Sequence, residues 1–92
     1  MLIRLIEVEK TIRGGTPILK EIYLNPGHII SIMDDVRANQ TLVKEAIALG
    51  LDAEVRFSKI TIQEGTVPKI ITVVGTPGQI YKKLKKKTVL RG

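Results

Sequence analysis

Residues 59–84 read KITIQEGTVPKIITVVGTPGQIYKKL and hold the clearest structural signals in the chain. Two runs rich in β-branched residues flank a turn that contains glycine and proline, a pattern typical of paired strands. The second run leads into a marked helix start, because Thr76 can cap the helix, Pro77 suits its first position and Gln79 stands where a capping-box partner belongs. This stretch therefore predicts a strand pair followed by a packed helix.

The first third of the chain has the alternation of an antiparallel hairpin and a third strand. Residues 2–12 and 18–24 alternate apolar and polar side chains on either side of a glycine-rich turn, so we expect them to pair. Residues 28–33 predict a short third strand. Its adjacent Ile29 and Ile30 place bulk on both faces, so we expect this strand to be covered on two sides.

The middle of the chain predicts a loop, a helix and a strand region of changing phase. Residues 34–39 are polar and predict a loop, while the apolar stripe of residues 41–49 predicts a helix that ends at Gly50. Within residues 55–62 the apolar positions switch from odd to even numbers. This switch predicts a bulge or a junction between two short strands.

The last strand and helix complete the predicted fold. Residues 70–74 predict a central strand, and residues 76–86 predict a helix whose apolar stripe of Ile80, Tyr81 and Leu84 faces the core. Residues 88–92 are expected to pair weakly or to fray. The sequence therefore predicts one α+β domain over residues 1–92: a mostly antiparallel curled sheet of five to six strands, or a small barrel, with two short helices. So short a chain has little helix to cover strands that are apolar on both faces, so we expect a homo-oligomer.

Composition excludes several classes of protein. The chain has no cysteine, so it has no disulfide and no thiolate for catalysis or metal binding. No apolar run approaches the roughly 18 residues of a membrane helix, and the first residues do not resemble a signal peptide. We therefore expect a cytoplasmic protein without a membrane span.

No group of residues matches a pattern of catalytic or cofactor chemistry. His28 is the only histidine and follows a turn, where a histidine more often hydrogen-bonds the backbone than acts as a base. Asp34 and Asp35 are adjacent, so they point apart on an extended chain, and no further ligands stand at metal spacing. Residues 75–78 lack the spacing of a phosphate-binding loop, and Pro77 has no N–H. We expect no enzymatic activity, no metal and no cofactor.

Positive charge is concentrated at the C-terminal end. Residues 1–78 carry equal numbers of acidic and basic side chains, so the net charge of +6 comes from the residues that follow. This basic tail begins at about residue 82, and its cations are Lys82, Lys83, Lys85, Lys86, Lys87 and Arg91. These side chains could contact nucleic-acid phosphates and give salt-dependent binding. Alternatively, they form a solvated helix face that complements the dipole at the helix C-terminus.

Residues 21–32 read EIYLNPGHIISI and residues 69–84 read KIITVVGTPGQIYKKL. These two segments resemble the FlbD family of small flagellar and swarming-motility proteins. The resemblance implies a hairpin, further strands and a short amphipathic helix, and it implies no catalytic residue. The chain differs from the family pattern through residues 34–52 and the basic tail. The strand junction from Asn25 to Ile32 is also similar to that of LytTR-type DNA-binding domains.

These observations favour a small non-enzymatic regulatory module that acts through protein–protein contacts as a homo-oligomer. The alternative is a nucleic-acid-binding regulator that uses the Lys-rich C-terminal helix. A third hypothesis is a pocket for a small anion or nucleotide at a subunit interface. Thr76 and Gln79 are assigned a structural role only, as the cap of the last helix.

Overall fold

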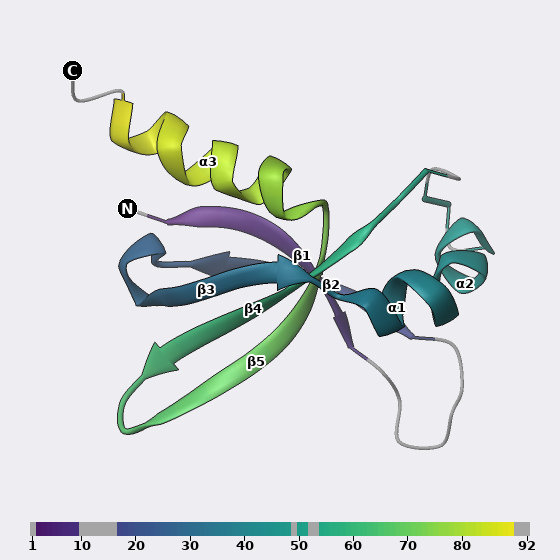
Figure 1. The fold of residues 1–92 in the computed structure, drawn as a ribbon, viewed down its shortest axis with the longest axis horizontal. Helices are drawn as coiled ribbons and strands as arrows, with labels where there is room; N and C mark the ends of the chain where they lie inside the picture. The colour runs from purple at the N-terminus through teal and green to yellow at the C-terminus, as the bar shows by residue number, and fades with distance from the viewer. Residues whose placement is uncertain (1, 10–16, 49, 52–53, 90–92) are drawn as a thin grey trace.

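The centre of the molecule is one antiparallel sheet with the strand order β2-β1-β5-β4-β3 (Figure 1). The computed structural model describes residues 2–9, 17–48, 50–51 and 54–89. The strands are β1 (Ile3–Glu9), β2 (Ile18–Leu24), β3 (Ile29–Asp34), β4 (Phe57–Glu64) and β5 (Val67–Val74). The helical segments are η1 (Pro26–His28), α1 (Val36–Thr41), α2 (Val43–Ala48) and α3 (Pro77–Val89).

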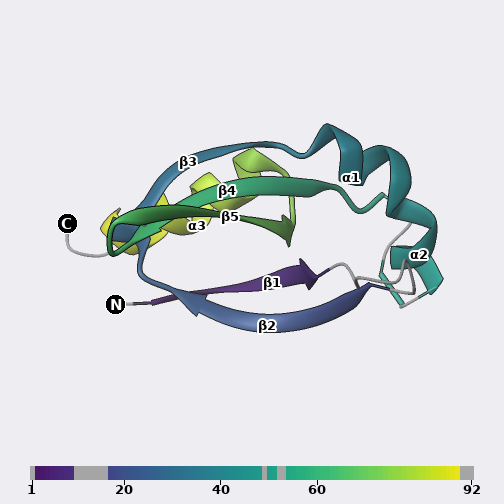
Figure 2. The same cartoon turned by 90° about the horizontal axis from the view of Figure 1, so that it is seen from below.

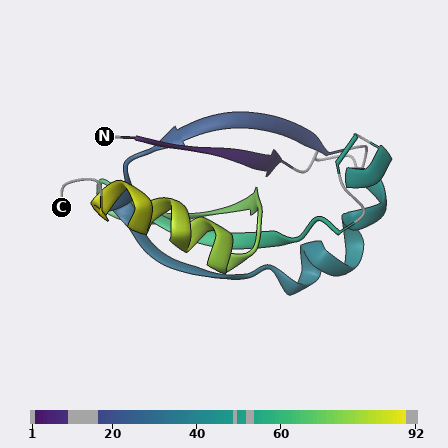
Figure 3. The same cartoon turned by 90° about the horizontal axis from the view of Figure 1, so that it is seen from above.

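The sheet curls without closing. Figure 2 shows β3, β4 and β5 in one layer facing β1 and β2, with η1 crossing between the layers at one end. Helix α3 runs along the open side of the curl, where Figure 3 shows it in front of β4 and β5. Strands β2 and β3 are the two edges of the sheet. The predicted α+β class and antiparallel sheet are therefore confirmed with five strands, whereas a sixth strand and a closed barrel are wrong for the described part of the chain.

The main core lies between the sheet and α3. It consists of Ile3, Leu5, Ile60, Ile62, Ile71, Val73 and Ile80. Ile80 is the one α3 residue in this set, and Leu84 packs against it one turn later. The core side chains are mainly β-branched and stiff about χ1, so they lose little rotamer freedom when strands pack. Few described side chains of α3 therefore hold this helix against the main core.

A second core lies at the other end of the sheet, under α1 and α2. It contains Val8, Ala38, Leu42, Val55 and Phe57. Strand β4 pairs with β5 without interruption from Phe57 to Glu64, so the predicted bulge or junction in this region is wrong. The apolar positions change from odd to even numbers because the two cores lie on opposite faces of β4. Phe57 belongs to the second core, whereas Ile60 belongs to the first.

Helix α1 occupies residues that the sequence predicts as a loop. The carboxylate of Asp35 accepts hydrogen bonds from Ala38 N–H at 3.0 Å and from the Thr72 hydroxyl at 2.7 Å. Asp35 therefore caps α1 and connects it to β5. Ala38 is completely buried, which fixes the first turn against the sheet. The helix predicted over residues 41–49 corresponds mainly to α2. Helix α1 precedes it, and Leu42 separates the two helices.

Strand β3 is an edge strand with exposed side chains. The prediction that this strand is covered on both faces is therefore wrong. Strand β3 pairs with β4, and its register shifts between Ile29 and Ser31, so Ile30 is the extra residue of a bulge. The bulge explains the adjacent isoleucines, because Ile29 packs against the main core while Ile30 is 56% exposed. Strand β5 lies between β1 and β4, which confirms the predicted central strand.

The two ends of the chain differ from the prediction in extent. Strands β1 and β2 pair along their whole length, which confirms the hairpin, and residues 10–12 of the predicted first strand lie outside the described residues. Helix α3 continues to Val89, so the weak β-pairing expected for the last residues is wrong for Thr88 and Val89. Over the described ranges, none of the helices combines the length and apolar character needed to cross a bilayer.

Candidate functional site

Hydrogen bonds fix the start of α3. Thr76 N–H donates to Gln79 Oε1 at 2.9 Å, and Gln79 N–H donates to Thr76 Oγ1 at 3.1 Å, so both hydrogen bonds of a capping box are present. Gly75 precedes the cap at φ +123°, a conformation that favours glycine. The buried Ser58 hydroxyl donates to the Gly75 carbonyl at 2.7 Å. Thr76 is therefore occupied by the cap, and this helix start offers few free donors to an anion.

The described lysines of α3 point away from the core. Lys82, Lys83 and Lys85 are all exposed. Lys83 Nζ donates to the Arg4 carbonyl at 3.2 Å, so this side chain lies over β1. The Lys85 ammonium group lies 6.0 Å from the centre of the Tyr81 ring, at the outer limit of a cation–π contact. Of these three lysines, Lys82 and Lys85 are therefore better placed than Lys83 to meet a partner.

The other cations predicted for nucleic-acid binding have no described side chains: Lys86, Lys87 and Arg91. The backbone of the first two continues α3, and Arg91 lies outside the described residues. The structure therefore brings the lysine-rich segment onto one helix. Its position near the helix C-terminus also suits the negative end of the helix dipole.

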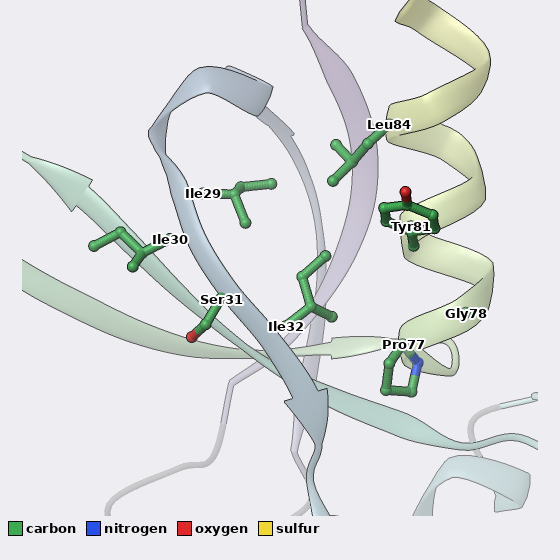
Figure 4. A pocket seen from close by; sticks show the side chains of 8 residues that line it. All are labelled: Ile29, Ile30, Ser31, Ile32, Pro77, Gly78, Tyr81 and Leu84. Atoms are coloured by element: carbon green, nitrogen blue, oxygen red, sulfur yellow. The ribbon is translucent and has the colours of Figure 1, made fainter.

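A groove of about 530 Å³ runs between β3 and α3 (Figure 4). It is lined by residues of both elements: Ile29, Ile30, Ser31, Ile32, Pro77, Gly78, Tyr81 and Leu84. Figure 4 shows Ile29 and Ile32 pointing towards α3, whereas Ile30 and Ser31 point away from it. The groove is therefore mostly apolar and follows an edge strand of the sheet.

Tyr81 belongs to this groove and not to the core. The sequence places Tyr81 on one apolar stripe with Ile80 and Leu84, but its side chain is 57% exposed while Ile80 is buried. The structure therefore corrects the prediction for Tyr81. The sequence signal for this groove is the spacing of Pro77 and Tyr81. Residues four apart are neighbours on a helix surface, so these two side chains lie together, beside the pair formed by Ile80 and Leu84.

Further apolar side chains are exposed on the opposite face of the sheet near the same edge. Met33 of β3 is 50% exposed and Ile70 of β5 is 63% exposed. Ile70 pairs with Thr61, and Thr61 pairs with Ser31 of β3. Residues directly opposite each other share a face of the sheet, so Ile70, Met33 and Ser31 face away from α3. The β3 edge thus exposes apolar surface on both faces.

The β2 edge has a different chemistry, because it carries charged pairs. Glu21 on β2 accepts a hydrogen bond from the Arg4 guanidinium, and Lys20 Nζ lies 3.2 Å from Glu9 Oε2. The hydrogen bond from Arg4 lowers the pKa of the Glu21 carboxyl, and the same bond raises the pKa of Arg4. Both pairs are exposed.

The remaining sequence candidates do not form a reactive site. His28 Nδ1 lies 3.7 Å from Glu64 Oε2. Asp34 is exposed, whereas Asp35 is buried in the α1 cap, so the two carboxylates do not act on one ligand. In the ranges that the structure describes, no group of three His, Asp or Glu side chains could hold a metal ion.

A second hollow, of about 340 Å³, lies beside the start of α3. Its lining includes the charged Arg56 and Glu54, together with Val55 and with Gln79 of α3. Arg56 Nη1 donates to the Val55 carbonyl at 2.8 Å. The opposite charges in its lining balance each other, so this hollow gives the anion-pocket hypothesis no net attraction for a phosphate.

Comparisons with protein-family models, with characterised proteins and with solved structures give no match. The resemblance to the FlbD family therefore stays a prediction. Two surfaces of the described residues bear on function: the apolar β3 edge and the exposed lysine face of α3.

Proposed function

We propose that this chain is a non-enzymatic, regulatory protein-binding module that works as a homo-oligomer and uses the β3 edge as its contact surface. The observation that carries this proposal is the exposure of apolar side chains on both faces of that edge. Tyr81 is exposed on one face, and Met33 and Ile70 are exposed on the other. Several large apolar side chains exposed near one edge are typical of interaction sites in soluble proteins.

Two physical arguments support self-association. Burial of apolar surface contributes about 25 cal/mol for each Å² removed from water, and a chain of 92 residues buries a smaller share of its surface than a larger domain does. A module that only binds a partner can act on it by covering the partner's contact surface. We call the proposed role regulatory for this reason.

Sedimentation equilibrium tests the proposal directly. We expect a mass of at least twice the 10.2 kDa of the chain, decreasing on dilution, with dissociation in the micromolar range or tighter. Met33→Lys should raise the dissociation constant. Tyr23→Lys, at a similarly exposed position on the β2 edge, is the matched control and should not. A monomer at every concentration up to about 100 µM would contradict self-association.

Nucleic-acid binding is the second candidate, and the exposure of Lys82 and Lys85 favours it. Among the ion pairs of the described residues, none involves either side chain. Binding to a random DNA duplex and to a single strand should be measured across a salt series. If the lysines contact phosphates, Lys82→Gln with Lys85→Gln should reduce the salt slope by about 1 to 2. Lys20→Gln on β2 is the control. Absence of binding at low salt would leave the lysines as a solvated face.

A further inference from the structure

We infer that β3 pairs with β3 of a second copy, antiparallel, about a two-fold axis at Ile32. This inference rests on the proposed homo-oligomer and specifies its contact. Its first support is the contrast between the edges of the sheet. The β2 edge carries Lys20 and Glu21 in ion pairs, and charged side chains oppose edge-to-edge pairing. Strand β3 has no lysine, arginine or proline, and its one charged residue, Asp34, stands at its end, so its edge carries fewer of these obstacles.

The backbone of β3 offers the groups that such pairing needs. Asp35 N–H donates to the Phe57 carbonyl at 3.1 Å, which places this pair of residues in the hydrogen-bonded position of the ladder. Because such pairs alternate along antiparallel strands, Ser31 and Met33 also direct their backbone groups towards β4. Ile32 and Asp34 therefore direct their N–H and C=O groups towards the free edge.

These free groups allow only a few two-fold arrangements. The two-fold axis is perpendicular to the joined sheet and lies between one residue of β3 and the same residue of the second copy. Even-numbered residues then pair with even-numbered residues. Both α3 helices lie on the same side of the joined sheet. An axis at Met33 would bring the two Asp34 carboxylates into diagonal contact at about 7–8 Å, which is unfavourable for like charges. An axis at Ser31 would place the bulged Ile30 at the centre of the contact, opposite Ile32.

An axis at Ile32 avoids both problems. Ile32 then faces Ile32 of the second copy, and Ser31 faces Met33 of the second copy on the opposite side of the sheet. The bulge falls at the outer ends of the contact. The two Asp34 carboxylates then lie at opposite ends of the contact, away from each other.

The area of a stable dimer requires the groove to take part. Such a dimer buries about 800 Å² on each partner, and the whole chain exposes 6453 Å². A strand of six residues is only about 20 Å long, so its edge alone supplies too little surface. We therefore expect the second copy to cover Tyr81 and Pro77 across the groove. Both β3 edges are then used, so the assembly closes at two copies.

Introduced cysteines test this register, because the chain has none of its own. Ser31 and Met33 of different copies would be a non-hydrogen-bonded pair with Cα atoms about 4.5 Å apart, a separation that permits a disulfide. Ser31→Cys and Met33→Cys variants should be mixed in equal amounts under reducing conditions and then oxidised mildly. Intact mass distinguishes the three disulfide products. We expect the mixed disulfide well above the twofold excess that random pairing gives.

The controls separate this inference from the proposed function. Circular dichroism of each variant checks the fold, and Tyr23→Cys on the β2 edge should stay mostly uncrosslinked. A dimer in sedimentation without excess mixed disulfide would overturn the β3 pairing and leave the homo-oligomer standing. A monomer in sedimentation would overturn both. A dimer with the mixed disulfide in excess supports the axis at Ile32.

Discussion

Replacing Ile80 by alanine should lower the free energy of unfolding by about 3–4 kcal/mol. The substitution removes three carbon atoms from a side chain that is only 1% exposed, which costs about 2.4 kcal/mol at roughly 0.8 kcal/mol for each carbon group. The surrounding strands are held by their ladders and cannot collapse fully into the space, so a cavity cost adds to this loss. A domain of this length has a total stability of about 5–14 kcal/mol, so the loss is a large part of it.

Urea unfolding followed by far-ultraviolet circular dichroism measures this effect, since the chain has no tryptophan to report by fluorescence. All variants should be compared at one protein concentration, because self-association changes apparent stability. Ile80→Val should cost about 1 kcal/mol. Lys82→Ala, two residues later on the exposed face, should stay within about 0.5 kcal/mol of the parent. If Ile80→Ala cost no more than Lys82→Ala, the packing of α3 on the main core would be wrong.

Two further predictions concern the β2 edge and the α3 cap. The pKa of Glu21 is lowered by Arg4, so this pair stabilises the fold above the unfolded-state pKa of the carboxyl, and its contribution is lost as pH falls through the folded-state pKa. A carboxyl NMR titration should find the Glu21 pKa below the usual range of a glutamate. Arg4→Gln should raise this pKa towards the usual range, and an unchanged pKa in the variant would contradict the role of Arg4. Thr76→Ala should cost about 1 kcal/mol in urea unfolding because it removes the acceptor for Gln79 N–H, whereas Thr76→Ser keeps that acceptor and most of the stability. Equal stability of the two Thr76 variants would show that the cap is unimportant.

Local chemistry made part of the fold predictable from the sequence. The Thr76 and Gln79 pair stands where the capping hydrogen bonds of α3 are found. The alternation in residues 2–12 and 18–24 predicts the pairing of β1 with β2. In each case the relevant contacts join residues that are close in sequence or separated by one turn, so the pattern of side chains is sufficient.

The errors arise where tertiary contacts decide between two local interpretations. The adjacent Ile29 and Ile30 indicate either a strand covered on both faces or a bulge, and only the pairing with β4 distinguishes them. The polar residues after Asp35 favour a loop until the buried Ala38 is known to anchor a helix. The groove could not be predicted because it joins β3 and α3, which are distant in sequence. The apolar stripe of α3 therefore predicts a core position for Tyr81, whereas the structure places this side chain in the groove.

The order of strands has a consequence for how the chain emerges from the ribosome. Strand β1 is made before its inner neighbour β5, whose Val73 pairs with Glu7. The β1–β2 hairpin therefore has to wait, with Ile3 and Leu5 still in contact with water, until β5 has been synthesised. Pairings between such distant segments form slowly, and chains that expose apolar strands meanwhile are prone to aggregate. Nascent chains stalled before β5 should consequently be good substrates for chaperones.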